Sequence, residues 1–375
     1  MREKPPVIVL SGVRWDFLWQ RHHALATMFA GAGYPTVFVE TTGLADPQLQ
    51  VGTLRKVASR LRRAGREAPT GERGLTVYAP LALPPTRGVF RRINRRLFVP
   101  RIAWDLHGIA GEAPVVVAYP PTRTTLDLIS ALQPRVVLYD CADDYEHYPG
   151  APGDIAATER ELLGLADLVS CTSEPLLEKV RPLRPDAFPS GPAVDYERFA
   201  LLQDDGPSGE VRTVCFFGSV SRERTNLAAL RAIAEAGFEV RLLGELGRVD
   251  RWFSRTPGID FRGEVPHAEL PAALAGVDAF VLPYEVNGLT ASISPAKTCE
   301  CLATGRPVVA SPLPALKELA GHVYLVERPE EFVAVLRDLG ELETEEKARA
   351  RIELARLNSW EARFDELEEA LWRVL

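Results

Sequence analysis

Short apolar runs alternate with longer amphipathic stretches along most of the chain, and this alternation predicts strands separated by helices. The apolar run Val7–Leu10 is followed by a helical stretch through Ala30 and by a second apolar run at Thr36–Glu40. This order is typical of a βαβ unit in a doubly wound parallel sheet. The alternation stops at a proline-rich stretch, residues 182–192, and restarts with Val214–Phe217. The pattern therefore predicts an α/β protein with two similar halves.

The proline-rich stretch also marks the expected domain boundary. We expect an N-terminal domain over residues 1–193 and a second domain over residues 194–358. The pattern is helical again near the end of the chain, where Ser359–Trp360 resets the phase of the apolar positions. A separate C-terminal helix is therefore expected over residues 359–375.

One stretch of the second half, residues 279–311, combines this pattern with candidate chemistry. The apolar run Ala279–Leu282 predicts a buried strand. Ser294–Pro295 predicts the start of a helix, with the serine capping its free N–H groups and the proline in its first position. Gly305 predicts the end of that helix, and Val308–Ala310 predicts the next strand. Unsatisfied N–H groups and the helix dipole favour an anion at such a helix start.

Lys297 and Glu300 lie on this predicted helix, three residues apart. At that spacing both side chains can point to the same side of the helix. The pair would supply a cation for phosphate and a carboxylate that accepts hydrogen bonds from hydroxyl groups. A sugar nucleotide offers both kinds of group.

Acidic residues follow a predicted strand in the first half. Asp143 and Asp144 come just after the apolar run Val136–Tyr139, and side chains at the carboxyl ends of such strands often serve function. The alternative is a surface acidic loop or a helix cap. Next to the first predicted helix, His22 and His23 are further candidates for proton transfer, and the alternative is that they cap or pack that helix.

Composition places the chain among globular proteins. Its 375 residues suffice for two cores, and contents of 46% hydrophobic and 25% charged residues are ordinary. No apolar run approaches the roughly 18 residues of a membrane span. The five scattered cysteines favour a reducing, cytoplasmic setting. No G-x-G-x-x-G follows the first predicted strand, so we expect no dinucleotide cofactor.

The charge is unevenly spread. The net charge is −7, yet residues 55–66 and 87–101 carry six basic residues each and no acidic one. Within the second segment, Phe90, Ile93 and Leu97 are spaced three and four apart, which predicts a basic amphipathic helix. Such segments favour an anionic partner, for example the inner face of a membrane or a phosphorylated acceptor. The alternative is a pair of helices with solvated basic faces, and both readings stay open.

Two short stretches of the second half carry a family resemblance. Residues 216–219 read Phe-Phe-Gly-Ser, and Val194, Asp195 and Phe199 follow a V-D-x-x-x-F spacing. The first stretch is similar to the F-V-G-R opening, and the second to the hinge, of the GT-B glycosyltransferases, in particular their family-4 group. The other similar positions, from the base-binding region to the G-x-P-V after the second glutamate, are Gly263, Val265, Leu270, Ala279–Pro283, Glu300, Gly305, Pro307 and Val308.

The resemblance implies two Rossmann-like domains that face each other across a cleft. The first would bind the acceptor, and the C-terminal helix would cross back to pack on it. The donor would be a nucleoside-diphosphate sugar, with UDP-sugar as first choice, bound as a substrate and without any cofactor. The implied positions are Gly218, Arg224, Ser294, Pro295, Ala296 and Lys297 for the diphosphate, Glu300 for the ribose, and Gly244, Gly263 and Val265 for the nucleobase region.

One departure from the family-4 pattern concerns the donor sugar. The first glutamate of the E-x7-E region is replaced by Ser292, so a retaining reaction is not implied. Ser292 and Asn287 would instead lie in the donor-sugar region. The S-P-x-K-x-x-E pattern resembles polysaccharide-type transferases, including the inverting glucuronosyltransferase of xanthan assembly.

The resemblance thus implies a metal-independent, inverting transfer to a hydroxyl acceptor. Asp143 or Asp144 is the first choice for the base and His22 the second, with Asp16 and His23 on the acceptor side. The acceptor would be a saccharide, a lipid-linked saccharide or a natural product, and no nucleic acid is expected. Two alternatives remain: a sugar-nucleotide epimerase and a non-catalytic nucleotide-sugar-binding protein on the same fold.

Overall fold

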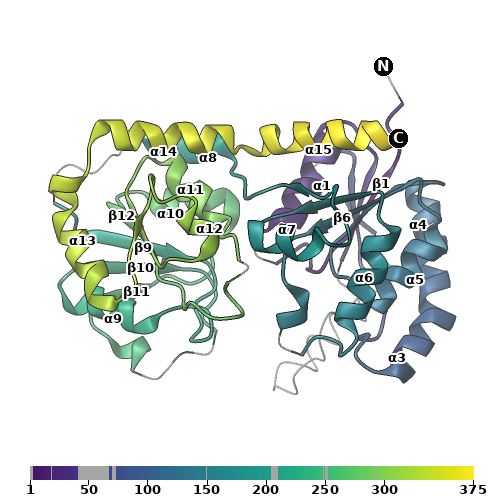
Figure 1. Cartoon of the computed structure of the whole chain (residues 1–375), viewed down its shortest axis with the longest axis horizontal. Helices are drawn as coiled ribbons and strands as arrows, with labels where there is room; N and C mark the ends of the chain where they lie inside the picture. Colours follow the sequence, from purple (N-terminus) through teal and green to yellow (C-terminus); the bar gives the residue numbers. More distant parts are fainter. Residues whose placement is uncertain are drawn as a thin grey trace. The chain divides into compact units, whose positions relative to one another are not determined.

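The computed structural model forms two compact units. The first unit comprises residues 1–172, 176–190 and 364–375, and the second comprises residues 173–175 and 191–363 (Figure 1). The residues that the structure describes are 3–17, 19–40, 67–69, 73–148, 150–203, 210–247, 249, 252–291 and 293–375.

The described residues of the first unit form an eight-stranded sheet in the order β3-β4-β2-β1-β5-β6-β7-β8. All neighbouring strands are parallel except β3 and β4. Strands such as β1 are buried at every residue, as expected where helices cover both faces of a parallel sheet. The strands are β1 (Val7–Leu10), β2 (Thr36–Val39), β3 (Glu67–Pro69), β4 (Leu75–Tyr78), β5 (Val115–Ala118), β6 (Val136–Cys141), β7 (Leu168–Cys171) and β8 (Phe188–Pro189).

Helices pack around this sheet, with α1 against β1 and β2 and with α4 against α5 (Figure 1). The last helix, α15 (Trp360–Val374), contributes its residues from Phe364 onward to this unit. Phe364 packs edge-on against Phe29, and Glu368 accepts hydrogen bonds from Tyr34 and Lys4. The remaining helical segments are α1 (Arg21–Gly31), α3 (Gly88–Ile93), η1 (Asn94–Phe98), α4 (Val99–Ala110), α5 (Arg123–Leu132), η2 (Tyr145–His147), α6 (Ile155–Leu165) and α7 (Glu174–Val180).

The helix predicted around Phe90 is less regular than its apolar spacing indicates. It continues from α3 through η1, a π-helical turn, into α4. A π-helical turn inserts extra chain and shifts the faces of the helix that follows. Phe90 and Ile93 are half-buried, but the Leu97 side chain is 65% exposed, and Asn94 is the buried residue of this turn. The expected apolar stripe is therefore wrong at Leu97.

The described residues of the second unit form a six-stranded parallel sheet in the order β11-β10-β9-β12-β13-β14. Its strands are β9 (Thr213–Phe217), β10 (Glu239–Leu243), β11 (Ile259–Phe261), β12 (Ala279–Leu282), β13 (Val308–Ala310) and β14 (Tyr324–Leu325). Its helical segments are α8 (Tyr196–Ala200), α9 (Leu227–Glu235), η4 (Phe253–Arg255), η5 (His267–Glu269), α10 (Leu270–Leu274), α11 (Lys297–Ala303), α12 (Pro314–Lys317), α13 (Pro329–Leu342) and α14 (Glu345–Leu357).

Both sheets contain a point where the strand order reverses. The first sheet grows from β1 toward β2 on one side and toward β5 on the other. The second sheet grows in the same way from β9 toward β10 and from β9 toward β12. Open α/β sheets bind ligands beyond the carboxyl ends of the strands at such points.

Candidate functional site

Glycines follow three neighbouring strands of the second sheet, from β9 at the reversal point to β10 and β11 on one side of it. Gly218 follows β9 with φ +118°, and its N–H donates to Leu243 at 2.7 Å. Gly244 follows β10 with φ +127°, and a Cβ there would lie 2.7 Å from the carbonyl carbon of Gly218. Its own N–H donates to Gly263 at 2.7 Å. Side chains are thus kept away from the ends of three neighbouring strands, while Val265 packs half-buried against the core.

Lys297 brings a positive charge to this glycine-lined edge. Its Nζ atom lies 4.2 Å from the ring centroid of Phe216 and 5.6 Å from that of Tyr284. A Cβ at Gly218 would lie 3.2 Å from Lys297 Cε and closer still to Nζ. Within the described ranges, no carboxylate forms an ion pair with this ammonium group. The aromatic faces stabilise the cation without neutralising it, which leaves its charge available to an anion.

Glu300 lies one turn after Lys297 on α11 and is held by a histidine. His267 Nε2 is 3.0 Å from Glu300 Oε1, and His267 Nδ1 is 3.1 Å from Arg198 Nη1. Arg198 in turn pairs with Asp195 at 3.0 Å. Neither Arg198 nor His267 is predicted as a site residue from the sequence, in which the only signal is Asp195 of the hinge-like motif.

The start of α11 differs from the prediction. The helix begins at Lys297, and Ala296 occupies the cap position without a side-chain hydrogen bond. The first turn is closed by backbone bonds, from Thr298 to Pro295 at 2.9 Å and from Cys299 to Ala296 at 3.2 Å. These tight bonds begin the helix after Ser294, so the predicted serine cap is wrong.

The loop after β12 is organised by Asn287. The Asn287 Oδ1 atom accepts hydrogen bonds from the N–H groups of Leu289 and Thr290, and Nδ2 donates to Glu223 at 3.0 Å. The carbonyl group of Arg224 accepts a hydrogen bond from Glu285 N–H at 3.0 Å, which ties the loop after β9 to the loop after β12. Ser292 lies outside the described residues.

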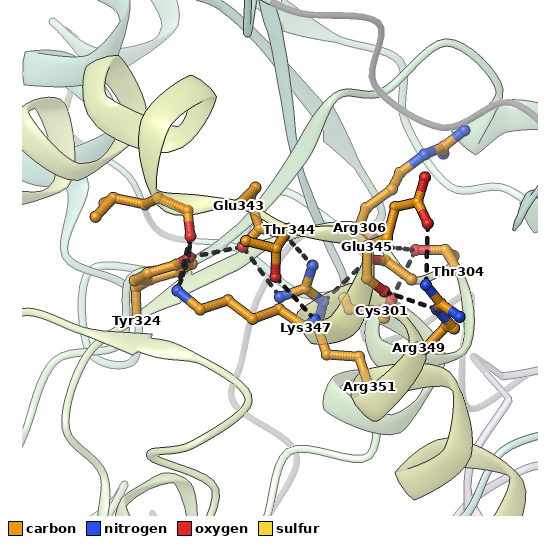
Figure 2. Close-up of polar contacts among 12 residues, drawn as sticks. Cys301, Thr304, Arg306, Tyr324, Glu343, Thr344, Glu345, Lys347, Arg349 and Arg351 are labelled. Atoms are coloured by element: carbon orange, nitrogen blue, oxygen red, sulfur yellow. Dashed lines mark hydrogen bonds and ion pairs between the residues drawn. The ribbon is translucent and has the colours of Figure 1, made fainter.

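The helix α14 packs against α11, and Figure 2 shows the polar contacts of its residues Lys347, Arg349 and Arg351. The buried Arg351 guanidinium donates to the Gly305 carbonyl group at 3.0 Å and pairs with Glu343, which also accepts a hydrogen bond from Tyr324. Gly305 has φ +75°, and a Cβ there would lie 3.0 Å from Ile352. These contacts fix the turn from α11 into β13 and thereby the position of the helix that carries Lys297.

His22 occupies the reversal point of the first sheet. Its ring stacks on Tyr119 with the centroids 3.7 Å apart, and its Nδ1 atom lies 2.8 Å from Ser11 Oγ. The Gly12 N–H donates to the same Nδ1 atom at 3.3 Å, which assigns the ring proton to Nε2. Burial, reinforced by the neighbouring His23 and Arg21, lowers the pKa of His22 well below its usual range. His22 is therefore a neutral imidazole that donates from Nε2.

His23 and Asp16 are placed differently. His23 is completely buried, accepts a hydrogen bond from Gln20 N–H at Nδ1 and bonds to the Arg14 carbonyl group through Nε2. These contacts are those of a residue that caps and packs α1. The half-exposed Asp16 side chain pairs with Arg14 at 2.6 Å.

The aspartates after β6 have unequal surroundings. Asp144 pairs with Lys179 at 2.7 Å and with His147 at 2.7 Å. Partial burial favours the protonated acid, but the hydrogen bonds and charges of Lys179 and His147 outweigh it and lower the pKa of Asp144. Asp143 lies half-buried in the same loop, and its carbonyl group accepts a hydrogen bond from Tyr145 N–H.

Asp140 at the end of β6 has a structural position. It is completely buried, pairs with Arg21 at 2.6 Å and accepts a hydrogen bond from Ser170 at 2.7 Å. Burial disfavours the charge of Arg21, but Asp140 outweighs this effect and raises the pKa of Arg21. The same guanidinium donates to Ser190. This network connects α1, β6, β7 and the segment after β8.

The described residues contain no group of three or more histidine, cysteine, aspartate or glutamate side chains placed to hold a metal ion. In the same part of the chain, no helix combines the length and the apolar character that a membrane crossing requires.

Comparison with known proteins bears directly on the second unit. Residues 211–341 match the family described as Glycosyl transferases group 1. This range begins just before β9, ends within α13 and contains the glycine-lined edge, Lys297 and Glu300. No curated protein sequence matches the chain.

Three solved structures with similar folds cover nearly the whole chain. A glycosyltransferase from Rickettsia africae has a TM-score of 0.63 at 13% identity, covering 100% of this chain and 99% of its own. Os79 from O. sativa, in complex with UDP, has a TM-score of 0.59 at 13% identity, covering 98% and 100%. A putative UDP-N-acetylglucosamine 2-epimerase from Listeria monocytogenes has a TM-score of 0.54 at 14% identity, covering 98% and 96%.

The fold is GT-B. The predicted α/β class with two Rossmann-like, parallel-sheet domains is thereby confirmed. Residues 211–341 match a glycosyltransferase family, and the structural neighbours share the fold of the whole chain.

Proposed function

We propose that this protein transfers a sugar from a UDP-sugar to a hydroxyl group of a saccharide acceptor, with inversion and without a metal ion. The observation that carries the proposal is that Lys297 and Glu300 occupy the same helix. They lie one turn apart on α11, within the family match and next to the reversal point of the second sheet. An ammonium group without a described carboxylate partner and a nearby carboxylate suit the diphosphate and the ribose of such a donor.

Each part of the donor would then meet a distinct set of residues. The absence of a side chain at Gly218 lets the diphosphate approach the backbone, and Lys297 and Arg224 neutralise its charge. The segment from Ser294 to Ala296 leads into that region. Gly244, Gly263 and Val265 border the nucleobase, and the loop shaped by Asn287 borders the donor sugar. Ser292 keeps the donor-sugar role that the resemblance implies.

The proposed reaction is a single displacement. The acceptor oxygen forms a bond to the anomeric carbon while the bond from that carbon to the diphosphate oxygen breaks. The electron pair of the broken bond goes to the diphosphate, whose charge Lys297 and Arg224 stabilise. The hydroxyl proton of the acceptor goes to a base supplied by the first unit.

Among the three candidates for this base, Asp143 is the one we favour. Asp144 is paired with Lys179 and has a lowered pKa, which makes it a weaker base. His22 carries its proton on Nε2, so we assign it the role of donating a hydrogen bond to the acceptor. Asp16 would lie on the same acceptor side.

A lipid-linked saccharide, as used in polysaccharide biosynthesis at the inner face of a membrane, is the acceptor that we propose. Leu97 and Trp104 are 65% and 67% exposed, and the exposed Arg92, Arg95 and Arg96 lie on the same helical run. Exposed apolar side chains next to cationic ones suit an anionic lipid surface. Arg91 is excluded from that role because it is engaged by Asp154. The other basic segment, residues 55–66, lies outside the described residues.

Incubation with radiolabelled sugar nucleotides, with and without lipid-linked saccharides, tests the reaction. We expect label to move to the acceptor, and Asp143→Asn to reduce this rate by about 10²-fold or more. Asp186→Asn, which alters an exposed aspartate of the same unit, is the control. Conversion of one sugar nucleotide into another without an acceptor would instead establish the epimerase. Binding without turnover would establish the non-catalytic protein.

Sedimentation with vesicles that contain anionic lipid tests the membrane contact. We expect co-sedimentation at low salt, and we expect it to weaken when Arg92, Arg95 and Arg96 are replaced by glutamine. Equal recovery in the supernatant with and without vesicles would overturn this part of the proposal.

A further inference from the structure

His267 and Arg198 hold Glu300 from the side of the protein, and their contacts lead to an inference about nucleotide selectivity. This inference rests on the proposed donor site and deepens it. His267 begins η5, and its side chain and that of Glu300 are 14% and 15% exposed, so the hydrogen bond between them is largely shielded from water. The other ring nitrogen, Nδ1, is hydrogen-bonded to Arg198, and Arg198 forms an ion pair with Asp195. The ring of Phe199 lies 6.0 Å from that of His267.

The position of Arg198 decides where the imidazole carries its proton. A guanidinium group only donates hydrogen bonds, so Nδ1 of His267 must accept the bond from Arg198. The ring proton therefore lies on Nε2, from which it is donated to Glu300 Oε1 at 3.0 Å. A doubly protonated ring would direct an N–H group at the guanidinium, so this arrangement selects a neutral histidine in one tautomer.

We propose that Arg198 and His267 form a positioning relay that gives the site its selectivity for ribonucleotides. A neutral donor fixes one oxygen of Glu300 without neutralising its charge, in the way that outer ligands orient a functional group. The second oxygen stays available to the vicinal hydroxyls of a ribose. Without the relay, the carboxylate can rotate and loses its preferred geometry toward both hydroxyls.

The test compares nucleotides with and without those hydroxyls. Calorimetric titration of the full chain uses the tightest-binding of UDP, ADP and GDP and its 2′,3′-dideoxy analogue. For His267→Phe, which keeps a ring but removes both nitrogens, we expect about tenfold weaker binding of the ribonucleotide and unchanged binding of the analogue. His267→Gln retains a donor and an acceptor and should restore most of the difference. In turnover, the KM for the donor should rise more than kcat falls.

Two further variants keep the test decisive. In a Glu300→Ala background, His267→Phe should have no additional effect, because the relay acts only through that carboxylate. Arg198→Leu, which leaves the histidine in place, should lower the ribonucleotide preference by a smaller factor. This variant carries the test if His267→Phe does not fold.

The outcomes separate the relay from the donor site. Equal loss for both nucleotides, an unchanged preference, or His267→Gln behaving like His267→Phe would overturn the relay while the donor site stands. If the unaltered chain binds no nucleoside diphosphate, the proposed function itself falls.

Discussion

The reversal points of the two sheets share a topology but hold opposite chemistry. In the first unit, a buried neutral histidine, His22, lies over the end of β1 and stacks on Tyr119. In the second unit, Gly218 directly follows β9, and the ammonium group of Lys297 lies against it. The fold thus provides a reversal point in each sheet, and the side chains around it determine whether it suits a hydroxyl group or an anion.

The charges near these points differ in the same sense. The first unit pairs its ionic groups internally, as in Arg21–Asp140 and Lys179–Asp144. In the second unit, Glu300 is held by an uncharged imidazole, and Lys297 lies against aromatic rings. We infer that the first set mainly stabilises the fold and that the second set is kept for a ligand.

The largest expected effect concerns the buried pair of the first unit. Asp140→Ala removes the carboxylate that compensates the buried charge of Arg21, so the free energy of unfolding should fall by about 3–5 kcal/mol. Urea denaturation followed by circular dichroism measures this loss. Asp186→Ala, at an exposed pair with Arg184, should cost at most about 1 kcal/mol. Similar small losses in both variants would contradict a structural role for Asp140.

Lys297→Ala should impair turnover rather than folding. In the proposed mechanism Lys297 stabilises the leaving diphosphate, so its removal should lower kcat/KM on the order of 10²-fold, which corresponds to about 2.7 kcal/mol. Steady-state kinetics with the UDP-sugar measures the effect, and Lys317→Ala, at an exposed lysine of the same unit, is the control. Loss of stability without loss of turnover would place Lys297 with the structural charges of the first unit.

Two glycines with positive φ separate backbone strain from close approach. Alanine at Gly237 causes only backbone strain from the positive φ, because no neighbouring atom lies within 4 Å of the added Cβ. Alanine at Gly244 causes the same strain and also clashes with the carbonyl group of Gly218. We expect Gly244→Ala to lower the free energy of unfolding by about 2 kcal/mol more than Gly237→Ala. Thermal denaturation of both variants provides the comparison. Equal losses would mean that the strand ends are less closely packed than described.

The smallest effect is expected from the pH dependence of Asp144. Its folded pKa is lowered, so its contribution to stability is present above the unfolded pKa, about 3.9, and disappears as the pH falls through the lower folded value. Asp144→Asn should therefore be less stable than the unaltered chain at pH 6 and equally stable at the acid end. Urea midpoints between pH 6 and pH 2.5 measure this convergence. Asp260→Asn, at an exposed pair with Arg262, should stay close to the unaltered chain throughout.

The sequence predicts the parts of this structure that depend on near neighbours. The buried run Val7–Leu10 is a strand, and Lys297 and Glu300 lie on one helix, because both follow from local pattern and spacing. The start of that helix was mispredicted since backbone bonds from Pro295 and Ala296 close its first turn without a serine cap. The apolar stripe predicted through Leu97 is wrong because the spacing of apolar residues does not signal a π-helical turn.

Contacts between distant residues escaped prediction for a different reason. His267 and Glu300 are 33 residues apart, and Arg198 is 69 residues from His267. Their meeting depends on how η5, α8 and α11 pack, which periodicity does not encode. The partnership of Asp144 with Lys179, 35 residues later, likewise appears only once α7 is packed. The sequence therefore locates candidate residues at strand ends more easily than the partners that position their side chains.

The contacts of α15 bear on the order in which the chain acquires its structure. Phe364 completes the packing around Phe29, and Glu368 joins Tyr34 to Lys4, although the ribosome makes these last residues after the whole second unit. During synthesis, part of the apolar surface of the first unit stays uncovered until the residues from Phe364 onward are made, whereas the second unit can fold before them. A fragment that stops near residue 190 would therefore lack part of the core of the first unit.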